Sequence, residues 1–213
     1  HADMYPPAID ALVNRIQSMT YDAVVLTGDY RAWTFGEIEA SMLGMRRLCD
    51  RFEAPVYGVL GNHYTIRMVP ELEAMGIRML LNESVSIERG GEAIHLAGID
   101  DAHYYRADNI EKAVEGIPSS AVAILLSHTP EIYRQAAHAG FDLFFCGHTH
   151  GGQICLPGGF PLTLDARCPR RLGYGVWRHG KMQGFTSAGA GTSIVEVRIN
   201  CPPEITLHTL RRS

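Results

Sequence analysis

The sequence predicts an α/β fold in which two packed β-sheets are flanked by helices. Three features of the chain lead to this prediction. The first two thirds alternate short apolar runs with stretches of helical periodicity, an order typical of a mostly parallel sheet and its covering helices. The apolar runs are continuous, as in strands that are buried on both faces. Beyond Gly151 the chain changes to Gly, Pro and short β-type runs, which indicates a second sheet packed against the first.

The N-terminal elements follow from periodicity and from helix-breaking residues. The first helix places Ile9, Leu12 and Ile16 on one face, at the spacing of an amphipathic helix. A later short helix is stopped by Gly76. In chain order we predict a helix over Pro7–Met19, a strand over Ala23–Gly28, a helix over Glu37–Phe52, a strand over Pro55–Gly61 and a short helix over Pro70–Met75.

The remaining elements rest mainly on apolar runs bounded by polar segments. No repeat, low-complexity tract or linker divides the chain, so we predict a single domain over residues 1–213. We expect strands near Met79–Leu81, Val85–Ile87, Ala93–Ile99, Ala121–Leu126 and Asp142–Cys146, helices over Asn109–Glu115 and Pro130–Ala139, and β-type runs at Phe185–Ser187, Ser193–Val197 and Ile205–Leu210.

Composition narrows the class of protein. The chain has 213 residues, of which 46% are hydrophobic and 20% charged, as is ordinary for a soluble globular domain. The formal net charge of −4 disfavours nucleic acid as a partner, because nucleic-acid binding needs a basic surface. The five cysteines are irregularly spaced and form no CxxC pair, so we predict neither a disulfide framework nor a zinc ribbon. No apolar run approaches the ~20 residues that a membrane helix needs.

Four of the predicted strands end in polar residues that can bind metal. Ligands in an open α/β sheet bind beyond the carboxyl ends of the strands, so the ends of neighbouring parallel strands bring such residues together at one edge. A single histidine at a strand end carries little information, whereas a set of four clusters is specific. The clusters are Gly28-Asp29-Tyr30, Gly61-Asn62-His63, Ser127-His128 and Gly147-His148-Thr149-His150.

These residue types suit the chemistry of a pair of divalent cations. Imidazole and carboxylate together favour manganese, iron or zinc. Asp29 can offer an oxygen to each of two cations, and Asn62 adds a neutral oxygen that limits the negative charge. Two cations polarise a phosphoryl group and lower the pKa of a bridging water toward neutrality, which gives a hydroxide nucleophile. His63 is then free to stabilise the transferring phosphoryl group or to protonate the leaving oxygen.

The series GD, GNH, SH and GHTH, from Asp29 to His150, resembles the calcineurin-like metallophosphoesterase family. The segments GHTHGGQICLPGG at Gly147–Gly159 and NCPPEIT at Asn200–Thr206 resemble a bacterial subgroup of that family. This subgroup contains small phosphodiesterases, often exported or anchored by an N-terminal segment, and lies near enzymes that hydrolyse UDP-2,3-diacylglucosamine. The resemblance covers essentially the whole chain and implies a four-layer α-β-β-α sandwich.

The resemblance also implies a role for each candidate residue and two divalent metal ions, Mn, Fe or Zn, as cofactors. Asp29 would bridge the two metals, and His63 would be the catalytic histidine. The other ligands would be Asn62, His128 and His148 for one metal and His150 for the other.

His1 completes the implied ligand set. The family pattern opens with Asp-x-His ahead of the GD motif, and we read His1 as the histidine of that motif. Its Asp would lie two residues earlier, outside the sequence given, so we expect the chain to be truncated at its N-terminus. An incidental terminal residue is the alternative reading. A preceding signal or anchor would allow export or peripheral membrane association; without one, the bacterial cytoplasm is the expected compartment.

We therefore expect a metal-dependent phosphoesterase that cleaves a phosphodiester or pyrophosphate in a small-molecule or lipid-linked substrate. The motifs do not separate monoesters from diesters; the subgroup favours diesters. The alternative is a non-catalytic, metal-stabilised binding domain, which leaves His63 without a role, and a nuclease is disfavoured by the net charge. His103, which follows two aspartates, is left open as a further residue at the site, and no substrate-binding residue is assigned.

Overall fold

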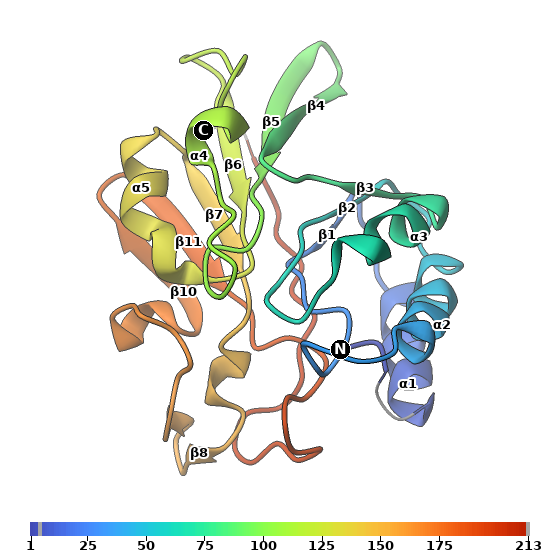
Figure 1. The fold of residues 1–213 in the computed structure, drawn as a ribbon. Coiled ribbons are helices and arrows are strands. Elements are labelled where there is room, and N and C mark those ends of the chain that lie inside the picture. The colour runs from blue at the N-terminus through green and yellow to red at the C-terminus, as the bar shows by residue number, and fades with distance from the viewer. Residues whose placement is uncertain (4–5, 212–213) are drawn as a thin grey trace.

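Four layers make up the computed structural model of the chain, which describes residues 1–3 and 6–211 (Figure 1). Two β-sheets pack face to face. The small sheet has the strand order β1-β2-β3, and the large sheet has the order β10-β11-β7-β6-β5-β4. Helices α1, α2 and α3 lie outside the small sheet, and α4 and α5 lie outside the large one. The predicted fold class, two packed sheets flanked by helices, is confirmed.

The small sheet and its helices come from the first 79 residues. All its strands are parallel, with Val56 paired to Val24 on one side and to Ile77 on the other. The predicted helices and the first two strands are confirmed, and the third strand begins two residues earlier than expected. The elements are α1 (Pro6–Gln17), β1 (Val24–Leu26), α2 (Glu39–Cys49), β2 (Val56–Gly58), the 3-10 turn η1 (Ile66–Met68), α3 (Val69–Ala74) and β3 (Ile77–Met79).

The large sheet is mixed. β5, β6, β7 and β11 are parallel neighbours, whereas β4 and β10 pair antiparallel at the two edges. The elements are β4 (Glu83–Arg89), β5 (Glu92–Gly98), α4 (Ile110–Ala113), β6 (Val122–Leu126), η2 (Pro130–Ile132), α5 (Tyr133–His138), β7 (Leu143–Cys146), η3 (His150–Gly152), β8 (Cys155–Leu156), β9 (Phe160–Pro161), η4 (Arg170–Leu172), β10 (Gly175–His179) and β11 (Met182–Thr186).

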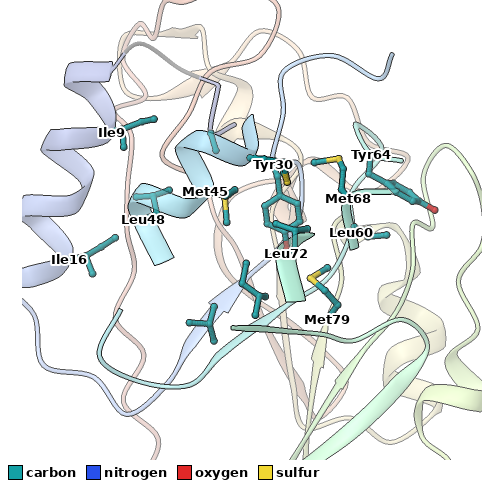
Figure 2. Close-up of a cluster of buried hydrophobic side chains, with 14 residues drawn as sticks. Ile9, Ile16, Tyr30, Met45, Leu48, Leu60, Tyr64, Met68, Leu72 and Met79 are labelled. Atoms are coloured by element: carbon teal, nitrogen blue, oxygen red, sulfur yellow. The ribbon is translucent and has the colours of Figure 1, made fainter. Parts of the chain in front are cut away.

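The strands β1, β6 and β7 are continuous apolar runs, and the side chains of β6 pack on both faces of the sheet. In β6, Ala123 and Leu125 pack in the cluster under α4 and α5, while Ile124 and Leu126 pack between the two sheets. This alternation is the period of a β-strand with a core on each side. A third cluster fills the space between the small sheet and helices α1–α3 (Figure 2). The packed layers thus fix the strand ends, and with them the loops that follow.

One prediction about the sheets was wrong. The C-terminal region does not form the second sheet by itself: only part of Phe185–Ser187 lies in a strand, and within the described residues Ser193–Val197 and Ile205–Leu210 form none. The second sheet is instead built mostly from β4–β7, which we had placed in the first sheet. A continuous apolar run shows that a strand is buried on both faces, but does not show to which of two packed sheets it belongs.

Candidate metal centre

The predicted ligands come together where strands of both sheets end. β1 and β2 run parallel in the small sheet, β6 and β7 run parallel in the large sheet, and the loop after each strand carries one of the four clusters. Side chains from all four loops meet around His128. The expectation that they would meet at the edge of a single sheet was therefore wrong: they meet where the carboxyl ends of two sheets face each other.

His128 lies at the centre of the first group of candidate ligands. Its Nε2 atom is 2.8 Å from Asn62 Oδ1, 3.0 Å from His148 Nδ1 and 3.3 Å from Asp29 Oδ2. Its Nδ1–H donates to the carbonyl oxygen of Thr27 at 2.7 Å, so Nε2 carries the lone pair when the ring is neutral. Histidines that bind metal usually have their other ring nitrogen fixed in this way.

The separations among these atoms match those between ligands of one cation. Atoms about 2.1 Å from a metal lie roughly 3.0–3.4 Å apart in octahedral or tetrahedral geometry. One ligand atom from each of Asp29, His128 and His148 lies within 4.8 Å of the other two. Asp29 is 7% exposed and His128 is 2% exposed, so these donors have lost most of their water. Desolvated nitrogen and oxygen donors that converge in this way fit a divalent metal.

A second group of imidazoles lies close to Asp29. His1 Nε2 is 3.7 Å from Asp29 Oδ2, and the His1 ring is 5.2 Å from the ring of His150 and 5.6 Å from that of His63. Asp29 Oδ2 therefore faces both groups, while Oδ1 accepts the backbone N–H of His63 at 2.9 Å. Oδ2 is thus the carboxylate oxygen that lies near both His128 and His1.

The backbone of the candidate ligands is strained. Asp29, His148 and His150 have φ angles of 55°, 70° and 51°, in the left-handed region that side chains with a Cβ rarely adopt. Such conformations cost about 1–3 kcal/mol each and persist only where the surrounding structure imposes them. Here the strain turns three side chains back over the ends of β1 and β7, toward the same point.

Charge distribution in the site favours cation binding. Burial opposes ionisation of Asp29, but His128, His1 and His63 together outweigh it and hold the pKa of that carboxyl well below its ordinary value. Burial also opposes the charged form of His128, but Asp29 and the Thr27 carbonyl together raise its pKa, so a metal bound there would displace a proton. Burial also lowers the pKa of His63, lowers that of His150 to about 3 and lowers that of His148 well below its ordinary value. Near pH 7 the carboxylate is thus charged and these imidazoles are neutral, which are the forms that bind metal.

Several buried nitrogens of the site have no hydrogen-bond partner within residues 1–3 and 6–211. These atoms are Nδ1 and Nε2 of His1, Nδ1 of His63 and Nε2 of His148. Buried polar atoms in folded proteins are nearly always partnered, so four such nitrogens in one place need an explanation. Lone pairs directed at a cation, or N–H groups directed at a substrate, account for them.

Arg198 is a residue of the site that sequence reasoning missed. Its guanidinium lies 3.3 Å from His150 Nδ1 and donates to the carbonyl oxygens of Ala188, Gly189 and Gly191. The contact holds a guanidinium group against the ring of His150 and so limits the orientation of that ring. No motif surrounds Arg198 in the sequence, so nothing there signals this contact.

His103, which the sequence left open, does lie at the site. Its ring centroid is 4.3 Å from that of His148, and its Nδ1 is 2.9 Å from Glu131 Oε1. The fully buried Asp101 shapes this loop, since its carboxylate accepts the backbone N–H groups of His103, Tyr104 and Tyr105. The signal that could have found His103 is its position after β5, whose carboxyl end is next to that of β6.

The chain is similar to several known proteins. A family model described as calcineurin-like phosphoesterase matches residues 1–152. The Bacillus subtilis protein YpbG is 31% identical over 217 residues, which cover 98% of this chain and 78% of YpbG. The Escherichia coli phosphodiesterase YaeI is 27% identical over 164 residues, which cover 72% of this chain and 57% of YaeI. A solved structure, the Haemophilus influenzae NAD nucleotidase, shares 16% identity with a TM-score of 0.48, covering 86% of this chain and 44% of that one.

The assignment rests on the family match, because the likeness to the solved structure is distant. The matched region runs from His1 to just past His150 and so contains every predicted ligand cluster. The chain therefore belongs to the calcineurin-like phosphoesterase family and is a hydrolase that acts on phosphoester bonds.

Proposed function

We propose that the chain is a dinuclear-metal-dependent phosphodiesterase or pyrophosphatase. The observation that carries the proposal is the position of Asp29 Oδ2, which is 3.3 Å from His128 Nε2 and 3.7 Å from His1 Nε2. A carboxylate oxygen near two groups of imidazoles suits two adjacent divalent cations. Manganese, iron and zinc are the metals that these ligand types favour.

The proposed ligands divide into two sets that share Asp29. When bound, the two cations would act as Lewis acids that polarise the phosphoryl group and activate water. The unpartnered nitrogens of His1 support this assignment, because the lone pair of the buried ring is taken up by no described residue. The first set is Asn62, His128 and His148, and the second is His1 and His150.

We assign the catalytic role to His63. Asp29 Oδ1 accepts its backbone N–H, and Arg31 Nε donates to its carbonyl oxygen at 3.3 Å, so its backbone is held at both ends. The ring lies beside that of His1 with Nδ1 buried and unpartnered among the described residues. In this role the imidazole binds the transferring phosphoryl group or protonates the leaving oxygen.

For the substrate we propose a small-molecule or lipid-linked phosphodiester or pyrophosphate. The relative YaeI carries the name phosphodiesterase, which supports a diester. In the part of the chain that the structure describes, no helix is long and apolar enough to cross a bilayer.

The test is hydrolysis of bis-p-nitrophenyl phosphate with added Mn²⁺, with p-nitrophenyl phosphate as the monoester for comparison. We expect His63→Ala to lower kcat by about 10²–10⁴-fold while bound manganese, measured by mass spectrometry, is unchanged. Asp29→Ala should lose both activity and metal, because it removes the shared ligand.

The alternative, a non-catalytic metal-stabilised binding domain, makes a different prediction. It would bind manganese fully in the wild type and release no p-nitrophenol from either substrate. Turnover of the monoester alone would instead exclude the diesterase and leave a phosphomonoesterase.

A further inference from the structure

An open cavity of about 520 Å³ lies at the start of α5 and the loop before η4. This volume is typical of small-molecule sites, which range over about 300–1,000 Å³. None of its lining residues belongs to the proposed metal centre. They include Glu131, Tyr133, Arg134, Gln135, Arg167 and Cys168.

The cavity is next to the metal centre. Glu131, in its wall, binds His103 Nδ1 through Oε1 at 2.9 Å, and the His103 ring packs on the candidate ligand His148. The same Oε1 accepts the backbone N–H of Arg167 at 2.7 Å. Asp165, two residues before Arg167, has a carboxylate oxygen within 4.8 Å of ligand atoms of both histidines. The loop from Asp165 to Arg167, which spans at most about 7 Å, thus leads from the metal centre to the cavity.

The wall of the cavity is positively charged. Arg134 and Arg167 are exposed, and their guanidinium groups form no salt bridge with the residues described here. The Arg134 guanidinium lies 5.2 Å above the Tyr133 ring, which limits its freedom. The one carboxylate of the wall, Glu131, already accepts from His103 and from the Arg167 backbone. Two arginines without a salt bridge to any described residue contrast with the net charge of −4 of the chain.

We propose that this cavity binds a second phosphate group of the substrate, beside the phosphoryl group that is attacked at the metal centre. The proposal rests on the proposed function, because it places the scissile ester at the metals. Guanidinium groups suit this role, since their planar N–H donors match the oxygens of phosphate. The substrate class is thereby narrowed to phosphoesters that carry two phosphate groups separated by a short spacer.

The test uses alkane bisphosphonates with a phosphonate at each end, from ethane to hexane, as inhibitors of bis-p-nitrophenyl phosphate hydrolysis in excess Mn²⁺. Propylphosphonate, with one anionic group, is the reference inhibitor. In the wild type we expect the best-fitting bisphosphonate to inhibit at a concentration about tenfold or more below that of propylphosphonate, because it gains charged hydrogen bonds.

In the double variant Arg134→Gln/Arg167→Gln, the best-fitting bisphosphonate should inhibit no better than propylphosphonate, so its advantage is lost. The variant should keep kcat/KM for bis-p-nitrophenyl phosphate, which has a single phosphate. Arg51→Gln, an exposed arginine after α2, is the matched control and should keep the advantage. The proposal is overturned if the double variant retains the advantage, or if no bisphosphonate inhibits better than propylphosphonate in the wild type.

The experiment distinguishes an error in the proposed function from an error in the phosphate-binding role proposed for the cavity. If the wild type hydrolyses no phosphoester, calorimetric titration of the manganese-loaded protein with the same bisphosphonates decides the question. If the double variant binds the bisphosphonates more weakly than the wild type, the phosphate-binding role of the cavity is supported. If both bind them equally, that role is overturned. Circular dichroism melting checks that the variants are folded.

Discussion

The two oxygens of the Asp29 carboxylate have different partners. Oδ1 accepts the N–H of His63, whereas Oδ2 faces the imidazoles on both sides of the proposed dinuclear site. Gly61 makes this arrangement possible, because a Cβ at that position would lie 2.1 Å from Asp29 Oδ1. A residue that binds nothing itself thus allows the shared ligand to sit against the backbone of the next loop.

We predict that Gly61→Ala weakens metal binding without removing a ligand. The new methyl group must push the Asp29 carboxylate away, and displaced ligand support typically costs about 10–100-fold in metal affinity. The measurement is calorimetric titration with Mn²⁺. Gly98→Ala is the matched control, since its methyl group would be equally crowded but would meet Leu80 and Val59 in the core. Unchanged affinity in Gly61→Ala would contradict the role given to Asp29.

Residues at the site divide into those with a local signal in the sequence and those without one. Asp29 and His128 were predictable because a ligand that directly follows a buried strand has its position set by that strand. Arg198 and Glu131 were not, because their contacts depend on how the tail and η2 fold against loops far away in the chain. The residues that flank Arg198 and Glu131 in the sequence therefore do not predict these contacts.

The C-terminal tail is the element that the sequence described least well. Its apolar runs predict strands, yet the described residues beyond β11 form only an isolated bridge between Ile199 and Ile154. Side chains hold this segment in place: Arg198 binds carbonyl groups, and Glu204 accepts the backbone N–H of Ala188. Apolar composition alone cannot distinguish a strand from an extended segment anchored in this way. The sequence did not predict β10, because this strand begins at a glycine within a Gly-rich region, a composition that indicates turns.

His208 anchors the end of this tail to the large sheet. Its ring stacks on Phe145 of β7 at 4.4 Å and meets Phe185 of β11 edge-on at 4.7 Å. Packing against these rings removes water from the imidazole and lowers its pKa. A lowered pKa means that the unfolded chain binds the proton more readily. The contribution to stability is therefore present above the unfolded value of about 6.5 and is lost as the pH falls below it.

We predict that His208→Phe, which cannot be protonated, becomes more stable relative to the wild type as the pH falls from about 7.5 to about 5. The change should stay below about 1 kcal/mol because the ring is partly exposed and water screens its charge. Urea unfolding of metal-free protein at both pH values measures it. His138→Phe, an exposed substitution on α5, controls for the added phenyl ring. A stability difference that does not change with pH would contradict this account.

At the scale of the whole molecule, the two sheets are joined in two ways. Apolar side chains such as Val59, Leu96 and Ile124 fill the space between them, and the candidate metal centre joins their carboxyl ends. Asn62 and Asp29 reach the centre from the small sheet, and His128 reaches it from the large one. A cation bound there would link elements far apart in the sequence, so its binding energy would act on the folding of both sheets together.

We therefore predict that manganese stabilises the whole domain. At a free concentration about 100 times its Kd, a ligand that binds only the folded state adds about 2.7 kcal/mol to the free energy of unfolding. For a chain of this size that corresponds to a rise in Tm of roughly 5–11 °C, which a chelator should reverse. Asp29→Asn should lose most of the rise, and Asp22→Asn, an exposed carboxylate paired with Arg89, should keep it.

Hydrogen exchange separates this global effect from a local one. If the cations link the sheets, amides of β1 and β2 should gain protection together with those of β6 and β7, because all four strands end at the centre. Protection confined to one sheet would mean that the cation is held by residues of that sheet alone, and would contradict a centre that joins the two sheets. A rise in Tm that is equal in wild type and Asp29→Asn would place the cation elsewhere on the molecule.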